Sequence, residues 1–291
     1  MFQHLLICTT LQDGLQRLIH FAPDIAASGV RKIIFLHVLP IEDRGIPKPD
    51  VEKVEQARAQ LTYATSELPA DIEVKVEIQS GRPAERILAT AQEHHADLVI
   101  LGTESRNLLT EKLFGSTAIA LCQARKVPVL ILRPQLISTY TVEELALRCR
   151  HLFRYFLIPY NGSRASEHLL TQIRQAGTAR AFTSLQECFL LWILEEHARV
   201  DKLLHQSRRQ EAETKLATAK AGLEQVDLKV TTQVVEGEPI PETLKVAVEY
   251  DITAIALASD TLGRLGELSK PSFAGEMLRR SWHPVLFFPS P

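Results

Sequence analysis

GRPAERILATAQEHHADLVILGT, the stretch from Gly81 to Thr103, decides the fold because the chain contains it in two versions. The second version, GEPIPETLKVAVEYDITAIALAS, runs from Gly237 to Ser259, 156 positions later and without insertion or deletion. The same offset places VPVLIL (Val127 to Leu132) on HPVLFF (His283 to Phe288). A repeat of this length indicates two copies of one domain, and the differences between the copies show which of them retains a ligand site.

Within each copy, short apolar runs alternate with amphipathic helical patterns. The expected strands of the first copy are His4–Thr9, Lys32–Leu39, Ile72–Ile78, Asp97–Gly102 and Val127–Leu132. Those of the second are Phe156–Pro159, Cys188–Leu194, Leu228–Val235, Ile252–Ala258 and Val285–Phe288. Strands that alternate with helices predict a parallel sheet with right-handed crossovers. We therefore predict an α/β fold of two doubly wound, five-stranded parallel-sheet domains in tandem.

The length of 291 residues suits two domains of about 145 residues each. We place the first domain at 1–134, a linker at 135–150 and the second domain at 151–291. Thr141 and Glu144 have the spacing of a capping box, which predicts a helix in the linker. The net charge of −2 offers no basic field for a nucleic acid or a membrane. Because there is no apolar run of about 18 residues and no signal-peptide pattern, we expect a cytoplasmic protein.

The four cysteines form no CxxC pair, and three of them lie in apolar surroundings. We expect Cys8, Cys122 and Cys188 to be buried, reduced thiols, whereas Cys149 is less easily placed. The adjacent His94 and His95 point to different faces of a helix, so we interpret them as a solvated helix end. Neither the cysteines nor the histidines predict a metal site.

A phosphate-binding pattern follows the fourth strand of the first copy. GTES (Gly102 to Ser105) is followed by nine residues and then by GST (Gly115 to Thr117). A glycine that ends a buried strand lets a phosphate approach the backbone, and a helix that begins at the second group offers free amides and the positive end of its dipole. Ordinary turn and cap chemistry uses the same residue types, and both interpretations remain open at this point.

With these motifs, the chain resembles a tandem universal stress protein, two UspA-like domains in one polypeptide, over nearly its whole length. Nucleotide-binding members carry G-x2-G-x9-G-[ST] after the fourth strand; here the spacing is intact and two of the three glycines are present. The resemblance implies an adenine nucleotide alpha-hydrolase-like fold with strand order 3-2-1-4-5, and ATP or AMP in a crevice between strands one and four. It assigns the site to Thr10, Val38 (as a backbone contact to adenine), Gly102, Ser105, Gly115, Ser116 and Thr117.

Two residues of the first copy depart from the family pattern. Thr10 lies where nucleotide-binding relatives usually have an Asp, and Ser105 replaces the middle glycine. His37, near the end of the second strand, resembles a common family feature, and we interpret it as a satisfied core or rim histidine.

The second copy departs further. Ile158 to Ser163 resembles the family's first-strand signature, but the three glycine positions of the phosphate loop map to Ala258, Thr261 and Pro271. A proline removes an amide donor where one is wanted, and only Ser272 remains of the motif. We expect the second copy to act as a structural or interaction partner.

No catalytic motif is present, so we predict a non-enzymatic regulator that binds ATP or AMP in the N-terminal domain and acts through contacts with an unknown protein partner. The alternative is a nucleotide-free scaffold of the stress response, and weak ATP hydrolysis would need a base that the sequence does not reveal. The resemblance implies that Val127–Leu132 and Val285–Phe288 pair or pack across an internal pseudo-twofold. Whether two chains form a homodimer is left open.

Overall fold

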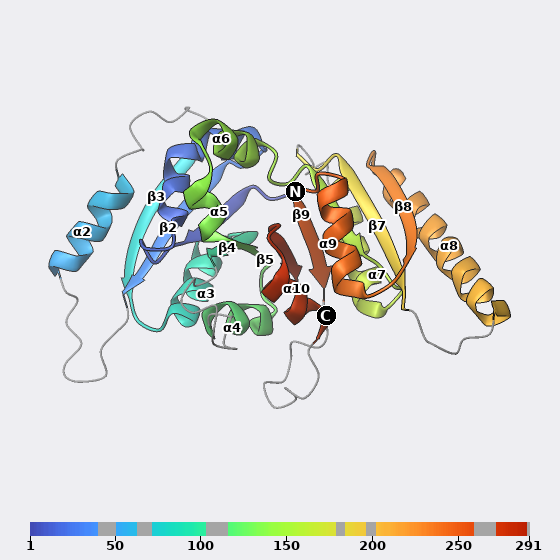
Figure 1. Cartoon of the computed structure of the whole chain (residues 1–291). Helices are drawn as coiled ribbons and strands as arrows, with labels where there is room; N and C mark the ends of the chain where they lie inside the picture. Colours follow the sequence, from blue (N-terminus) through green and yellow to red (C-terminus); the bar gives the residue numbers. More distant parts are fainter. Residues whose placement is uncertain are drawn as a thin grey trace. The chain divides into compact units, whose positions relative to one another are not determined.

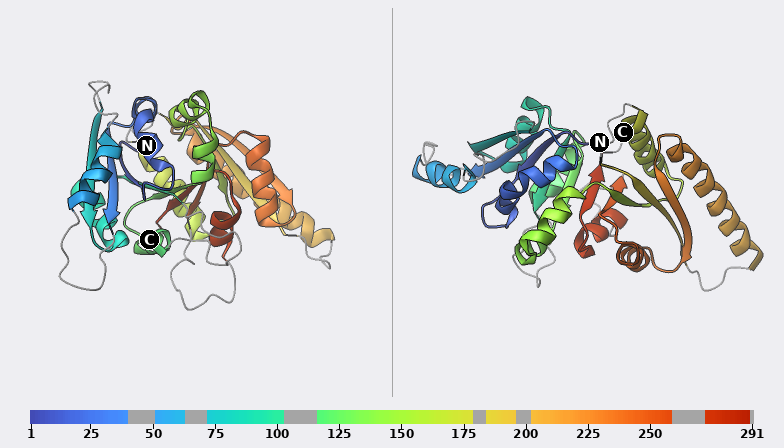
Figure 2. Two further views of the ribbon diagram at one scale, coloured as in Figure 1. Left: turned by 60° about the vertical axis from the view of Figure 1, so that its left-hand side comes forward. Right: turned by 90° about the horizontal axis from the view of Figure 1, so that it is seen from above.

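The computed structural model describes residues 1–39, 51–62, 72–102, 116–178, 184–195, 202–258 and 272–289. The chain divides into two compact units, Phe2–Arg150 and His151–Pro291. In each unit a twisted parallel sheet has helices on its faces, as Figures 1 and 2 show. The structure therefore shows the alternation of strands and helices that the sequence predicts.

The sheet of the first unit has the order β3-β2-β1-β4-β5, and the pairs within it are parallel. Its strands are β1 (His4–Cys8), β2 (Lys32–Leu39), β3 (Glu73–Ser80), β4 (Leu98–Gly102) and β5 (Val129–Leu132). The predicted strand order is confirmed. β1 and β4 are almost entirely apolar and buried because helices cover both faces at the middle of such a sheet, whereas β3 at the edge is partly exposed.

The sheet of the second unit has the order β10-β9-β6-β7-β8, the same succession written from the other end. Its strands are β6 (Tyr155–Pro159), β7 (Glu187–Leu194), β8 (Lys229–Glu236), β9 (Ala254–Ala258) and β10 (Val285–Phe288). β3 and β8, β4 and β9, and β5 and β10 are each separated by 156 positions. Gly81 and Gly237, at φ +147° and +142°, make the same turn after β3 and β8, so the repeat extends to backbone conformation.

Helices connect the strands in both units. In the first they are η1 (Leu15–Phe21, a 3-10 helix), α1 (Ala22–Ala27), α2 (Val51–Thr62), α3 (Pro83–Glu93), α4 (Ser116–Ala124), α5 (Pro134–Thr139) and α6 (Val142–Arg150). In the second they are α7 (Arg164–Thr178), α8 (Lys202–Glu224), α9 (Pro239–Glu249) and α10 (Phe273–Arg280). α3 contacts α4, whereas α6 contacts η1 and α1, consistent with two helical layers on opposite faces of the first sheet.

The predicted linker folds as α5 and α6 against η1 and α1 of the first unit. The capping box is confirmed: the Thr141 amide donates to Glu144 Oε2 at 3.0 Å, and the Glu144 amide donates to Thr141 Oγ1 at 3.3 Å. Leu145 and Cys149 of α6 are buried. Residues that join the domains in sequence therefore belong structurally to the first one.

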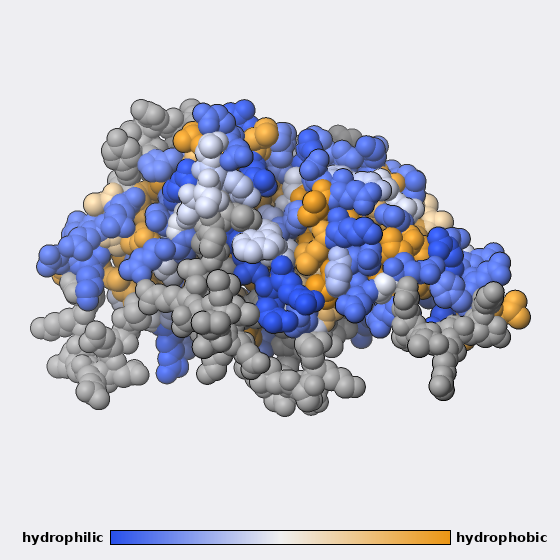
Figure 3. All heavy atoms as spheres, in the orientation of Figure 1, coloured by the Kyte–Doolittle hydropathy of each residue, from blue (hydrophilic) through white to orange (hydrophobic). Residues whose placement is uncertain are grey.

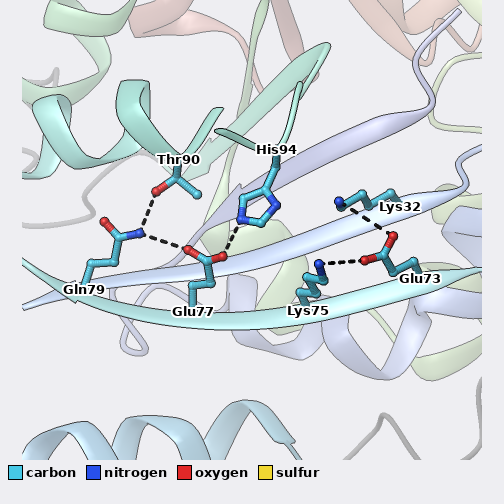
Figure 4. A network of polar contacts seen from close by, with 7 residues as sticks. All are labelled: Lys32, Glu73, Lys75, Glu77, Gln79, Thr90 and His94. Carbon is cyan, nitrogen blue, oxygen red and sulfur yellow. Dashed lines mark hydrogen bonds and ion pairs between the residues drawn. The ribbon is translucent and has the colours of Figure 1, made fainter. Parts of the chain in front are cut away.

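A polar network ties the edge strand β3 to its neighbours (Figure 4). His94, at the end of α3, pairs with Glu77 of β3, and Gln79 Nε2 donates to Glu77 Oε2 and to Thr90 Oγ1, both at 2.9 Å. The side chain of His94 is only 10% exposed. Our interpretation of a solvated helix end is therefore wrong for His94, because Glu77 on the adjacent face of β3 binds the imidazole.

The charged run of α8 is a solvated helix face. Arg209 pairs with Glu213 on the same helix and with Glu236 of β8, at 3.1 and 3.0 Å. Figure 3 shows mainly hydrophilic side chains along the visible side of this helix, with apolar ones at its outer end. Across the described ranges, none of the helices combines the length and apolar character that crossing a bilayer requires.

All four cysteines are buried free thiols, including Cys149 on α6. Burial raises the pKa of Cys122, Cys149 and Cys188 to about 12, and raises the pKa of Cys8 further with help from Asp13. With a pKa of about 12, only about one thiol in ten thousand is ionised at pH 8, and the thiolate is the reactive form. The folded protein should therefore be inert toward thiol reagents.

We expect the native protein to show no rapid reaction with an aromatic disulfide reagent at pH 8, and four thiols to react once guanidinium unfolds the chain. Absorbance of the released thiolate measures both stages. A native thiol that reacts within seconds would contradict the burial of that cysteine.

Candidate functional site

The carboxyl ends of β1, β2 and β4 meet at one edge of the first sheet. Cys8, the last residue of β1, is paired with Leu36 on one side and with Leu101 on the other. Thr10, Val38 and Gly102 therefore follow at the same edge, which is where the strand order reverses direction. This position is the usual ligand crevice of a doubly wound sheet.

α4 returns from this edge across the sheet. It ends at Ala124, shortly before β5 begins at the opposite edge, so its first turn, with Ser116 and Thr117, lies toward the carboxyl edge. Thr117 is partly exposed. Of the predicted site residues, Ser105 and Gly115 lie outside the described residues, and the other five belong to this edge or to the helix that starts there.

Gly102 is a strand residue, not a turn residue. It ends β4 in register with Leu132 of β5, and its φ angle is not positive. Its backbone conformation does not require glycine. What glycine contributes here is a backbone without a Cβ, which a ligand can approach closely.

The loop after β1 is held by a carboxylate that sequence reasoning missed. Asp13 accepts hydrogen bonds from the Thr9 hydroxyl at 2.7 Å and from the amides of Thr10 and Leu15, both at 3.0 Å. Thr9 Oγ1 in turn accepts from the Leu11 amide at 2.9 Å. Position 10 itself is a threonine, and the carboxylate three residues later is used to hold the loop. The signal was the Thr-Thr-x-x-Asp spacing, since such residues bond nearby amides in turns.

His37 supports the same loop from β2. Its Nδ1 lies 2.9 Å from the carbonyl oxygen of Thr9, so this nitrogen carries the proton and donates. The residue is only 9% exposed. The interpretation of His37 as a satisfied rim histidine is confirmed, and Val38 follows it at the partly exposed end of the strand.

The corresponding edge of the second unit carries larger side chains. The Thr9 amide donates to Leu36 O at 3.0 Å in the first unit, and the Tyr160 amide donates to Leu191 O at 2.8 Å in the second. By this register Tyr160 replaces Thr9, and Trp192 of β7 replaces His37.

Tyr160 and Trp192 form an aromatic pair at this edge. Their ring centroids are 5.7 Å apart in an edge-on arrangement, and Lys215 Nζ of α8 lies 5.9 Å from the Trp192 ring. The Tyr160 hydroxyl donates to Glu167, and burial together with this carboxylate raises its pKa. Gly162, at φ +68°, lies against Lys215 and Trp192, where an added Cβ would come within 3.2 Å of Lys215 Cδ. Side chains of the unit thus occupy the edge that is lined by threonines in the first unit.

The remnant of the phosphate loop in the second unit has a structural role. Ser272 is the N-cap of α10, and its hydroxyl accepts from the Gly275 amide at 3.1 Å. Ala258 ends β9, and Thr261 and Pro271 lie outside the described residues.

Both units therefore have the architecture of doubly wound α/β domains whose order switch lies between the first and fourth strands. The sequence model of the universal stress protein family matches residues 1–133 and 153–289, so the chain belongs to the universal stress protein family and carries two of its domains in tandem.

Individual relatives agree with this assignment. A universal stress protein from Archaeoglobus fulgidus DSM 4304 is 18% identical, with a TM-score of 0.68 over 99% of this chain and 96% of that one. A protein from Pseudomonas aeruginosa PAO1 is 13% identical, with a TM-score of 0.57 over 99% and 92% of the two chains. At these identities the likeness shows the fold alone.

A similarity in sequence links the chain to the stress response protein NhaX of Bacillus subtilis (strain 168), which is 30% identical over 95 residues. The match covers 32% of this chain and 56% of NhaX, so the chain spans about half the length of this curated relative.

We expect Tyr160→Phe to lower the free energy of unfolding by about 1–2 kcal/mol, because it removes the hydrogen bond to Glu167 from a side chain that is only 3% exposed. Chemical denaturation measures the change. Tyr250→Phe is the control: it keeps the ring contact with Phe189 on a residue that is 36% exposed, and should change stability by less than about 0.5 kcal/mol. Equal losses in the two variants would contradict a specific role for the Tyr160 hydroxyl.

Proposed function

We propose that this universal stress protein is a regulator that binds ATP or AMP at the carboxyl edge of its N-terminal sheet and acts through contacts with a protein partner. The observation that carries the proposal is the difference between the two edges. The first has small residues, an open glycine backbone at Gly102 and the start of α4, whereas Trp192 and Tyr160 occupy the second.

The chemistry of the first edge suits a nucleotide phosphate. The first amides of a helix have no partner within the helix and carry partial positive charge, so the start of α4 at Ser116 and Thr117 offers donors to an anion. Gly102 lets the phosphate chain pass close to β4. On the other side of β1, Val38 is placed to offer its backbone to the adenine ring.

Thr10 gives the site its weakest contact. Its exposed hydroxyl can hydrogen-bond a ribose, but it brings no negative charge where nucleotide-binding relatives usually have an Asp. Asp13 does not replace that acid, because its oxygens already accept three hydrogen bonds from the loop. We therefore expect binding to depend mainly on the phosphates.

We propose binding without catalysis. Asp13 and His37, two titratable groups among the residues described at this edge, both hydrogen-bond to the backbone of the loop, so we assign neither as a base that activates a water. Within the described part of the chain, the His, Cys, Asp and Glu side chains form no group of three or more that could hold a metal ion.

A nucleotide-free scaffold is the second candidate function. The observation that favours it is the loop itself: the amides of Thr10, Leu11 and Leu15 are already satisfied by side chains of the same loop. A ligand would find few unpaired donors there. The pairing of Val127–Leu132 with Val285–Phe288, and the association of two chains, stay predictions under either function.

Calorimetry with ATP and AMP tests the proposal. We expect the wild-type chain to bind, and Gly102→Val to weaken binding by at least about tenfold because the new side chain occupies the approach to β4. The backbone at Gly102 is that of an ordinary strand, so valine should not unfold the protein.

Ala258→Val is the matched control, since Ala258 ends β9 in the second unit 156 positions after Gly102. Its affinity should equal that of the wild type. If the wild-type chain stays empty at millimolar ATP, the scaffold function replaces the regulator; if the Ala258 variant loses binding instead, the ligand belongs to the second unit.

A further inference from the structure

The linker helices lie against the segment that begins at the candidate site. η1 starts at Leu15, directly after the Asp13-bound loop. Arg17 of η1 donates to the carbonyl of Ile137 in α5 at 2.5 Å and to the carbonyl of Tyr140, just beyond α5, at 3.3 Å. The last carbonyls of a helix have no partner within it, so one guanidinium satisfies acceptors that the short helix α5 leaves open. We call these contacts the Arg17 clamp.

The linker begins next to the candidate site, on the side of β4 that faces β5. Gly102 is paired with Leu132, the last residue of β5, and α5 begins two positions later at Pro134. The two segments joined by the Arg17 clamp therefore leave the sheet from strands on either side of β4, one on β1 and one on β5. Both departures are at the carboxyl edge.

α6 extends the contact. Arg150 Nε pairs with Asp24 of α1 at 2.6 Å, and the guanidinium of Arg148 lies 4.2 Å from the ring centroid of Tyr140. With Leu145 and Cys149 buried, α6 is held by apolar packing as well as by charge. η1, α1, α5 and α6 thus form a continuous packed group next to the loop.

We propose that the state of the Thr9–Gly14 loop controls how firmly α5 and α6 dock, so that the linker between the two domains reports the occupancy of the N-terminal site. The ligand part of this proposal rests on the proposed function, whereas the coupling between loop and linker does not. A ligand at Thr10 acts on the loop that Asp13 holds; a shift of Leu15 displaces η1 and with it the Arg17 clamp. If the ligand changes the equilibrium between the docked and the released clamp by some factor, linkage requires that release of the clamp changes the affinity for the ligand by the same factor.

Hydrogen exchange of the full chain, followed by mass spectrometry, tests the coupling without ligand. Asp13→Ala removes all three hydrogen bonds that the Asp13 carboxylate accepts in the loop, and we expect amide exchange in 134–150 to become at least about threefold faster. Exchange in β4 serves as the reference for global unfolding.

Ser163→Ala is the matched control. Ser163 Oγ accepts from the Ser166 amide at 3.3 Å in the equivalent loop of the second unit, so its loss should leave 134–150 unchanged. Should Asp13→Ala fail to fold, Asp13→Asn weakens the same contacts with less damage. Unchanged exchange in 134–150 overturns the coupling.

Measurements with ATP test the second part of the proposal, that the linker responds to a ligand at the N-terminal site. Addition of ATP should change exchange in 134–150 of the wild type, and Arg17→Gln should abolish that change and shift the ATP dissociation constant by about fivefold or more. Arg17→Lys keeps the charge but loses the paired donors of the guanidinium. Its ATP-induced change in exchange and its ATP dissociation constant should lie between those of the wild type and of Arg17→Gln.

The outcomes separate the two proposals. A wild-type chain that does not bind ATP overturns the proposed function, and the Asp13 variants then decide the coupling alone. A chain that binds ATP with identical exchange in 134–150, and equal affinity after Arg17→Gln, keeps the function and overturns the coupling.

Discussion

The parallel pairing of β1 with β2 on one side and β4 on the other is the constraint on which the rest of each domain depends. Leu5, Leu6 and Ile7 are fully buried because helices cover both faces of the sheet, and the burial of such strands is the main stabilising contribution. The same pairing makes the chain leave the sheet in opposite directions after β1 and β4. A place for a ligand therefore arises from the topology before any particular residue is chosen.

The two domains carry different side chains at this place, and the difference has little effect on the core. Thr9 and His37 in the first unit correspond to Tyr160 and Trp192 in the second, while the strands beneath them remain buried and apolar in both. At the carboxyl edge of the second unit, an aromatic pair with a cation nearby adds packing contacts that stabilise the domain locally.

The sequence predicted the sheet well because its signal is repeated and local. The offset of 156 positions, the buried strands and the Thr141–Glu144 capping box each follow from residues close together in the chain. The sequence predicted the candidate site less well, because its contacts join distant segments. That Asp13 bonds its own loop, and that Glu77 binds His94, depends on side-chain directions that periodicity does not determine. Trp192 against Tyr160 required the strand register to be known first.

The linker shows why a domain boundary in sequence need not be one in space. Residues 135–150 lie between the two copies of the repeat in sequence, yet they pack on η1 and α1 and bury Leu145 and Cys149. Packing of this kind makes the start of the second domain continuous with the group of helices next to the N-terminal loop. In a tandem protein where one edge is filled by its own aromatic residues, a change at the other edge can reach the second domain along this covalent path without a second ligand. Under the proposed coupling, the fusion contributes more than proximity, because it supplies a connection through which one domain influences the other.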